Sequence, residues 1–265
     1  MRVERIPTLR DNYTYLVVDE ATGEAAVIDA PEAAPVVRRV EQLGVTVSKI
    51  LSTHHHGDHS HANPELAAHF RVDVFGHRSD AGRLPGLTQP LDEGDVVTVG
   101  KLAAEVLFIP AHTRGHVAYS FDGAVFCGDT LFAAGCGRLF EGTPAMMHRA
   151  LNVVLGALPD ETLVYCGHEY TESNLRFAAT LEPGNAALAE KIETVRAIRA
   201  RARPRWHDAD SDEMTVPSTI GDERATNPFM RAHSTELRAS VRANHPDAED
   251  EIAILGAARR MKDVF

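Results

Sequence analysis

Cysteine is scarce in this sequence, and long apolar runs are absent from it. The three cysteines, Cys127, Cys136 and Cys166, are an odd number without CxxC spacing, which excludes the disulfide framework of a small secreted domain. The first residues carry no apolar signal region, and no apolar run approaches the length that spans a membrane. We therefore expect a cytoplasmic protein with no membrane partner.

Positive charge is also in the minority. The sequence has 27 lysines and arginines against 38 aspartates and glutamates, and its formal net charge is −11. This balance argues against a protein that binds nucleic acids or anionic membranes through general electrostatic attraction. A chain of 265 residues with 44% hydrophobic content has room for one large domain, or for a large domain followed by a small one.

Histidine, by contrast, is concentrated in one short segment. Residues 53–59 read THHHGDH, so four imidazoles and one carboxylate fall within seven positions. Such donors suit zinc, iron, copper or nickel when they converge on one point. The preceding residues 49–53 are apolar and β-prone, so we expect the histidines on the loop that leaves a buried strand.

The spacing within this segment separates its donors. In extended backbone, the side chains of His54 and His56 point to one side and that of His55 to the other. We expect a helix from His59 to about residue 70 that bends back over the same point. One tetrahedral catalytic ion with an open position cannot use all four remaining donors, so two metal ions are plausible. These donors are His54, His56, Asp58 and His59.

Three later apolar strands also end in a side chain that can bind a metal. The strand at 104–109 precedes His112, the strand at 124–127 precedes Asp129, and the strand at 162–166 precedes His168. Random placement would rarely give such a set, and we expect these groups to complete the centre. We expect His116 to lie behind the centre rather than to bind a metal.

The remaining patterns indicate an α/β part followed by a helical part. We expect strands over residues 2–6, 13–18, 24–28, 45–52, 72–76, 95–99, 101–109, 118–121, 124–127 and 162–166. We expect helices over residues 31–43, 59–70, 143–157, 175–181, 186–202, 235–244 and 248–260. Strand patterns give way to helical patterns near Tyr170, so we expect a boundary there, between domains at 1–169 and 170–265. The polar segment 203–222 is expected to form a long loop.

The motifs of this sequence, in their order, resemble the metallo-β-lactamase superfamily and, within it, the hydroxyacylglutathione hydrolases, also named glyoxalase II. The HxHxDH motif at 54–59 is typical of the superfamily. The hydrolases are similar in GDTLF at 128–132, CGHEYT at 166–171, EPGN at 182–185, NPFMR at 227–231 and RRMKD at 259–263. The resemblance covers essentially the whole chain. It implies an αββα sandwich, the catalytic domain, followed by a smaller helical domain that binds substrate.

The resemblance also implies the division of ligands between two divalent metal ions, with zinc expected and iron or manganese as alternatives. The first ion is assigned to His54, His56 and His112, the second to Asp58, His59 and His168, and Asp129 to the bridge between them. In this reading Asp58 and Asp129 are the catalytic residues, and Asp58 orients rather than donates a proton. A hydroxide shared by the ions would hydrolyse S-D-lactoylglutathione to glutathione and D-lactate, the second step of methylglyoxal detoxification.

Substrate contacts implied by the resemblance lie at Arg138, Phe140, Tyr170, Arg259 and Lys262. Some relatives have Lys and Tyr at the first two positions; Arg138 keeps the charge with a different hydrogen-bond geometry, and Phe140 lacks the hydroxyl. Without the resemblance, Arg259 and Lys262 would be interpreted as charges that complement the dipole of a helix C-terminus. We expect a monomer whose partner is a small glutathione thioester, with no nucleic-acid partner.

Other functions remain open at this point. A sulfur (persulfide) dioxygenase of the same superfamily would use one iron with two His and an Asp, and another thioesterase of the same fold would use the same centre. An RNA-processing nuclease shares the first motif but needs a basic groove. A non-catalytic module would hold metal in a closed site without a position for substrate. The complete second ligand set and the helical tail favour the hydrolase.

Overall fold

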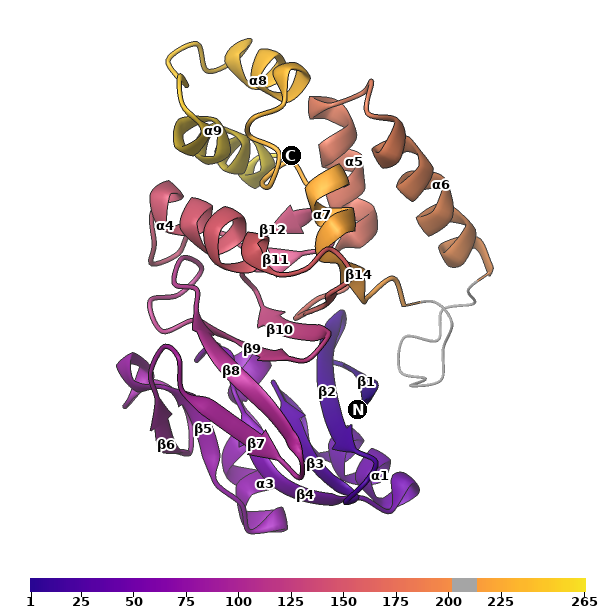
Figure 1. Cartoon of the computed structure of the whole chain (residues 1–265), viewed down its shortest axis with the longest axis vertical. Coiled ribbons are helices and arrows are strands. Elements are labelled where there is room, and N and C mark those ends of the chain that lie inside the picture. The colour runs from indigo at the N-terminus through magenta and orange to yellow at the C-terminus, as the bar shows by residue number, and fades with distance from the viewer. Residues whose placement is uncertain (202–213) are drawn as a thin grey trace.

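Two β-sheets packed face to face form the centre of the first part of the chain (Figure 1). The structure is a computed structural model, and it describes residues 1–201 and 214–265. The first sheet has six strands in chain order: β1 (Arg2–Thr8), β2 (Asn12–Asp19), β3 (Glu24–Ile28), β4 (Thr46–Leu51), β5 (Val74–His77) and β6 (Leu87–Leu91). The second sheet, also of six strands, runs in the order β14 (Ser218–Thr219), β13 (Leu163–Cys166), β10 (Ala124–Gly128), β9 (Val117–Phe121), β8 (Leu102–Phe108) and β7 (Val96–Val99). Two short strands form a separate ribbon: β11 (Leu131–Phe132) and β12 (Gly135–Cys136).

Strand β2 shows how sequence produces the layers. All of its residues are buried, and successive side chains point to opposite faces of the sheet. Tyr15 joins the core between the two sheets, whereas Leu16 joins a second core that includes Leu66. Helices α1 (Ala33–Leu43) and α3 (Asn63–Phe70) supply the outer side of that second core. A strand without alternating polarity is therefore explained by burial on both faces.

The remaining helices gather at one end of the molecule (Figure 1). Helix α4 (Pro144–His148) continues into helical turns that end at Ala157. The C-terminal part consists of α5 (Thr171–Leu181), α6 (Ala186–Arg201), α7 (Ile220–Thr226), α8 (Thr235–Arg242) and α9 (Glu251–Asp263). Helices α8 and α9 begin at the side chains Ser234 and Asp250, which accept the N–H of Leu237 and Ala253. The fold is the expected αββα sandwich followed by a helical part.

The ten expected strands are present, with ends that differ by at most two residues. The single helix expected at 59–70 is wrong, because the chain forms α2 (Gly57–Ser60) and then α3. Pro64 stands in the first turn of α3, and a continuous helix would bring its ring against the carbonyl of Ser60 while losing one hydrogen bond. The break frees the first segment to adopt the backbone that its donors require.

The expected loop at 203–222 is wrong at its end, and residues 203–213 lie outside the described part of the chain. Ser218 and Thr219 form β14, which pairs with β13 at the edge of the second sheet. Helix α7 then begins at Ile220, where the Thr219 hydroxyl accepts the N–H of Asp222 at 3.1 Å. Strand β6 was not expected; it contains Pro90, which an edge strand tolerates.

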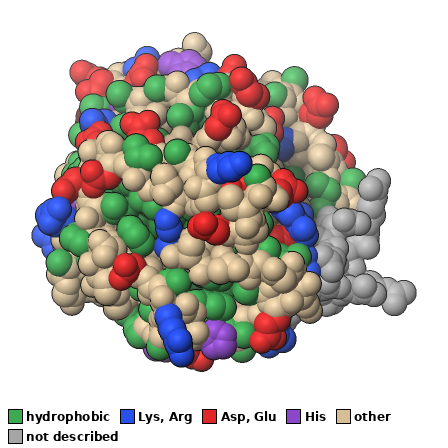
Figure 2. Space-filling view, turned by 60° about the horizontal axis from the view of Figure 1, so that its bottom comes forward, with side chains coloured by type: hydrophobic (Ala, Val, Ile, Leu, Met, Phe, Trp, Pro, Cys, Tyr) green, Lys and Arg blue, Asp and Glu red, His purple; other side chains and the backbone are tan. Residues whose placement is uncertain are grey.

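The surface agrees with the acidic composition. On the face that Figure 2 shows, acidic, basic and apolar side chains of the described residues are interspersed. That face has no continuous basic surface of the kind that a nucleic-acid backbone attracts. Within residues 1–201 and 214–265, no helix combines the length and the apolar character needed to cross a membrane.

Candidate metal centre

Four strand ends meet at one place between the two sheets. His54 follows β4, His112 follows β8, Asp129 follows β10 and His168 follows β13. All four side chains are buried. Because each donor comes within a few residues of the end of its strand, the two sheets fix the positions of the backbones that carry the donors.

Gly128 allows the end of β10 to come close to the histidine segment. Its φ is +47°, and a Cβ at this position would lie 2.3 Å from the Thr53 hydroxyl and 2.8 Å from the His116 ring. Glycine satisfies both the backbone conformation and the lack of space. A side chain here would push Asp129 away from the histidines.

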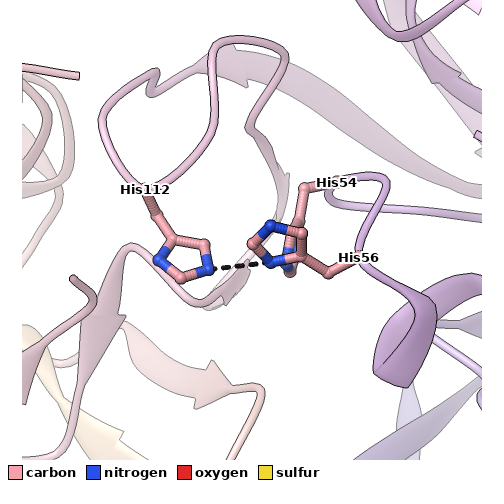
Figure 3. A group of neighbouring side chains, drawn as sticks. All are labelled: His54, His56 and His112. Atoms are coloured by element: carbon pink, nitrogen blue, oxygen red, sulfur yellow. Dashed lines mark hydrogen bonds between the residues drawn. The ribbon is translucent and has the colours of Figure 1, made fainter. Parts of the chain in front are cut away.

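The first donor group consists of three imidazoles from two loops (Figure 3). His54 Nε2 lies 3.1 Å from His56 Nδ1, and His112 Nε2 lies 3.1 Å from the same His56 atom. Figure 3 shows the rings of His56 and His112 directed toward each other from opposite loops. His112 is held from behind, because its Nδ1–H donates to the Arg138 carbonyl at 2.9 Å.

The second donor group consists of Asp58, His59 and His168. Asp58 Oδ2 lies 3.4 Å from His168 Nε2 and 3.7 Å from His59 Nε2, and the two imidazole nitrogens are 3.3 Å apart. Helix α2 brings Asp58 and His59 round to the end of β13. The broken helix is therefore part of how this group assembles.

Asp129 lies between the two groups. Its Oδ2 is 3.5 Å from His112 Nε2 and 3.4 Å from His168 Nε2, and its Oδ1 is 3.3 Å from His59 Nε2. The buried Oδ1 has no hydrogen bond of good geometry within the described chain. One carboxylate thus faces ligands of both groups.

These residues fit two divalent ions. Donors at about 2.0–2.1 Å from a tetrahedral ion are about 3.3 Å from one another, and the five separations given above run from 3.1 to 3.7 Å. Imidazole and carboxylate are donors that zinc, iron and manganese accept. The orphaned Asp129 oxygen provides an acceptor that a cation would satisfy.

The protonation states at the centre also favour a bound divalent ion. Burial holds the pKa of His54 well below its ordinary value and lowers the pKa of His56 to about 4, so both are neutral and able to bind a metal at pH 7. Burial would also lower the pKa of His59, but the carboxylates of Asp129 and Asp29 outweigh it and raise this pKa to about 10. The carboxylates therefore draw positive charge into a buried position, and a divalent ion supplies such charge.

Two aspartates that the sequence analysis missed support the ligands from behind. Asp29 accepts the N–H and the hydroxyl of Thr53 at 2.8 and 2.6 Å, and its Oδ2 lies 3.2 Å from His59 Nδ1. Asp11 Oδ1 lies 3.0 Å from His168 Nδ1. Asp29 is also near His54 and could be counted as a donor, but it faces the His59 nitrogen that points away from Asp129. We interpret both aspartates as supports that orient imidazoles.

His55 and His116 turn away from the centre. His55 faces Asp80, with 3.5 Å between Nδ1 and Oδ2. His116 is fully buried; its Nε2 accepts the N–H of Asp129 at 3.1 Å, and its ring stacks on that of His54. Neither imidazole directs a nitrogen at the donor groups.

A cavity of about 740 Å³ opens from the centre toward the helical part. That volume lies within the range of small-molecule binding sites. Its walls include all five residues that the resemblance assigns to substrate: Arg138, Phe140, Tyr170, Arg259 and Lys262. The floor includes His56, Asp58, His112, Asp129 and His168.

The cations of this cavity differ in their freedom. Arg138 is exposed at the rim, whereas Arg259 is only 4% exposed and donates to the Cys136 carbonyl at 2.6 Å. Lys262 places Nζ 5.1 Å from the centre of the Phe177 ring, and burial together with Arg259 lowers the pKa of Lys262 to about 8. Through its bond to Cys136, Arg259 connects α9 to β12. It is therefore not a free charge that only complements the dipole of its helix.

Two family models together match almost the whole chain. A family model described as "Metallo-beta-lactamase superfamily" matches residues 7–168, and one described as "Hydroxyacylglutathione hydrolase C-terminus" matches residues 169–265. The hydroxyacylglutathione hydrolase of Gloeobacter violaceus is 47% identical over all of both chains. This chain belongs to the hydroxyacylglutathione hydrolase family. The hydrolase of that name from Methylococcus capsulatus is 45% identical and is aligned over 100% of this chain and 99% of its own.

Solved structures share the fold of this hydroxyacylglutathione hydrolase family member. The crystal structure of ETHE1 from Myxococcus xanthus superposes with a TM-score of 0.66 at 25% identity, over 100% of this chain and 99% of its own. The BLEG-1 B3 metallo-beta-lactamase superposes with a TM-score of 0.63 at 21% identity, over 86% of this chain and 99% of its own, and shows the fold alone. The superfamily and the clustered donors together indicate a binuclear metal site.

Proposed function

We propose that this protein hydrolyses S-(2-hydroxyacyl)glutathione, with S-D-lactoylglutathione as substrate, to glutathione and a 2-hydroxy acid. One observation carries the proposal: five of the seven clustered donor groups line the floor of a cavity whose rim carries cations. The full-length similarity to proteins named hydroxyacylglutathione hydrolase supports the same reaction. In this proposal the metals are zinc, the protein acts as a monomer, and the reaction is the second step of methylglyoxal detoxification.

The roles of the residues follow from their positions. Two divalent ions, when bound, lower the pKa of water toward neutrality and polarise the thioester carbonyl. His54, His56 and His112 would hold one ion, and Asp58, His59 and His168 the other, with Asp129 facing both groups. Asp58 lines the open side of the cavity, where it can orient the attacking water as well as bind metal.

No protein nucleophile or strong acid is needed for this reaction. Cys136 is the cysteine on the cavity wall, but burial raises its pKa to about 11, so it is a thiol at neutral pH. The leaving group is a thiolate, whose conjugate thiol has an ordinary pKa of about 8.5. It departs far more readily than an amide nitrogen.

Local charge on the cavity wall opposes the charge of the whole chain. The chain carries a formal charge of −11, and the substrate carries two carboxylates. Arg138 and Lys262 put positive charge on the wall near the apolar rings of Phe140 and Tyr170. We infer that the cations bind the glutathione carboxylates while the rings contact its apolar part.

The decisive test measures turnover of the purified protein loaded with zinc. It should hydrolyse S-D-lactoylglutathione and leave the corresponding amide intact, because in this proposal Asp58 orients water and does not protonate a poor leaving group. Elemental analysis of the protein as isolated should give two metal ions per chain. Absence of thioester hydrolysis with both ions bound would overturn the proposal. The one-iron dioxygenase is disfavoured because the second donor group is complete.

Lys262 gives a prediction about substrate binding. Lys262→Ala should raise KM about tenfold to a hundredfold and leave kcat within about twofold, since the lysine contributes binding that is equal in substrate and transition state. KM of the unchanged protein should also rise as the pH rises through about 8, where the ammonium loses its proton. Initial rates from pH 6.5 to 9.5 would measure both effects.

Two variants serve as controls for Lys262. Lys262→Arg should keep KM nearly constant through pH 9, because the guanidinium remains charged. Lys101→Ala removes an exposed lysine that does not line the cavity and should change neither constant. If Lys262→Ala lowered kcat and left KM alone, the assigned binding role would be wrong.

A further inference from the structure

Behind the first donor group lies a polar cluster that the reaction does not use directly. Its central residue is Asp80, which ends the short 3-10 turn after β5 and is only 1% exposed. Asp80 Oδ2 and His55 Nδ1 are both buried, and neither has a hydrogen-bond partner of good geometry among residues 1–201 and 214–265. The two atoms face each other at 3.5 Å. A buried carboxylate oxygen without a donor is costly, so this pairing needs an explanation.

Arg83 connects Asp80 to a second carboxylate. The Arg83 guanidinium donates to Asp80 Oδ1 with one nitrogen and to Glu141 Oε1 at 2.6 Å with the other. Glu141 Oε2 accepts the N–H of Arg114 at 2.8 Å, and Glu141 Oε1 lies 3.9 Å from His55 Nε2. The cluster of Asp80, Arg83 and Glu141 therefore contacts two loops that carry metal-binding histidines.

Close packing limits the movement of these loops. A Cβ on Gly115 would lie 2.3 Å from Asp80 Oδ1, and a Cβ on Gly142 would lie 2.5 Å from the Ala111 carbonyl oxygen. The loop of His112 thus rests directly on Asp80. Because His112 also donates to the Arg138 carbonyl, the segment that leads to Glu141 supports the same histidine from its other side.

We propose that Asp80 and Glu141, bridged by Arg83, are positioning residues for the first metal ion. Asp80 Oδ2 faces His55, which lies in the chain between His54 and His56. Glu141 accepts the backbone N–H of Arg114, two residues after His112. The second donor group has other supports, Asp11 and Asp29, so the cluster acts on one ion of the two. This inference rests on the proposed binuclear centre.

The test compares Asp80→Asn with Asp92→Asn. Both variants replace an aspartate that pairs with an arginine near the same turn, but Asp92 and its partner Arg78 are exposed. Zinc affinity of each of the two sites is measured by competition with a chromophoric chelator, together with kcat and KM. Asp80→Asn should weaken one zinc site by about 10- to 100-fold and leave the other unchanged. Its kcat should fall at limiting zinc and recover at saturating zinc, with KM constant.

The outcomes distinguish a positioning role at one ion from a general loss of stability. Equal weakening of both sites, or unchanged affinity at both, would overturn the positioning role, since a general loss of stability does not select one ion. If Asp80→Asn does not fold, Glu141→Gln provides the same measurement at a less buried position. A starting protein that binds no zinc would instead refute the proposed function, so the two failures are distinguishable. Asp92→Asn should match the starting protein throughout.

Discussion

Asp129→Asn should abolish thioester hydrolysis, lowering kcat/KM by more than about a thousandfold, and should reduce the metal content below two ions per chain. The substitution keeps the shape of the side chain but removes the negative charge that faces both donor groups. Loss of a residue that only orients a ligand costs about 10- to 100-fold, and loss of a shared ligand should cost more. Elemental analysis and single-turnover rates would measure the two effects.

The matched control is Asp122→Asn, at an exposed position in the turn between β9 and β10. It makes the same chemical change before the strand that Asp129 follows, and activity and metal content should stay unchanged. Added zinc should not restore Asp129→Asn, because the amide cannot supply a charged bridge. An Asp129→Asn protein with two ions and more than about a tenth of the activity would show that this carboxylate is not the bridge.

The positions of the seven expected metal ligands could be predicted because they depend on local pattern. Each of His112, Asp129 and His168 follows its strand within four residues, and the strand ends could be recognised from apolar runs bounded by turn residues. The structure brings all seven predicted groups together at the ends of strands from both sheets. The alternation at His54, His55 and His56 also gave the side to which each ring turns.

The supports could be predicted less well because they depend on pairings between distant segments. Asp29 follows Ile28 at the end of β3, so the strand-end pattern could have identified it. Asp11 stands in the turn between β1 and β2, and its contact with His168 spans 157 residues. The turn reaches that position because Asn12 forms a bridge with His168 in the backbone. No local periodicity encodes this pairing.

The role of Arg259 on the cavity wall was also hard to predict from the sequence. From its place near the end of α9, Arg259 fitted either a helix-capping charge or a substrate contact. In the structure its guanidinium donates to the Cys136 carbonyl and lies 5.3 Å from the centre of the Phe229 ring. A residue that connects three segments and also lines a cavity has a double role, which composition and spacing do not reveal.

Asp29→Ala should lower the free energy of unfolding of the metal-free protein by about 3 kcal/mol. The change leaves the buried N–H of Thr53 without its acceptor, at a cost of about 1–3 kcal/mol, and it puts alanine at a φ of +51°, which costs about 1 kcal/mol more than aspartate. His59 loses its support at the same time, so zinc affinity should fall by about 10- to 100-fold. Urea denaturation and chelator competition would measure the two losses.

Asp29→Asn separates these contributions. Asparagine tolerates the left-handed conformation and keeps one acceptor for Thr53, so the stability loss should shrink to about 1 kcal/mol, whereas the loss of charge behind His59 should keep zinc affinity low. Arg71→Ala controls for conformation alone, because Arg71 is exposed, has a φ of +58° and should change stability by less than about 0.5 kcal/mol. If Asp29→Ala kept both stability and zinc affinity, the hydrogen bonds of Asp29 would be incidental to the centre. If zinc affinity fell and the free energy of unfolding did not, the role of Asp29 in orienting His59 would be confirmed and its role in folding would be wrong.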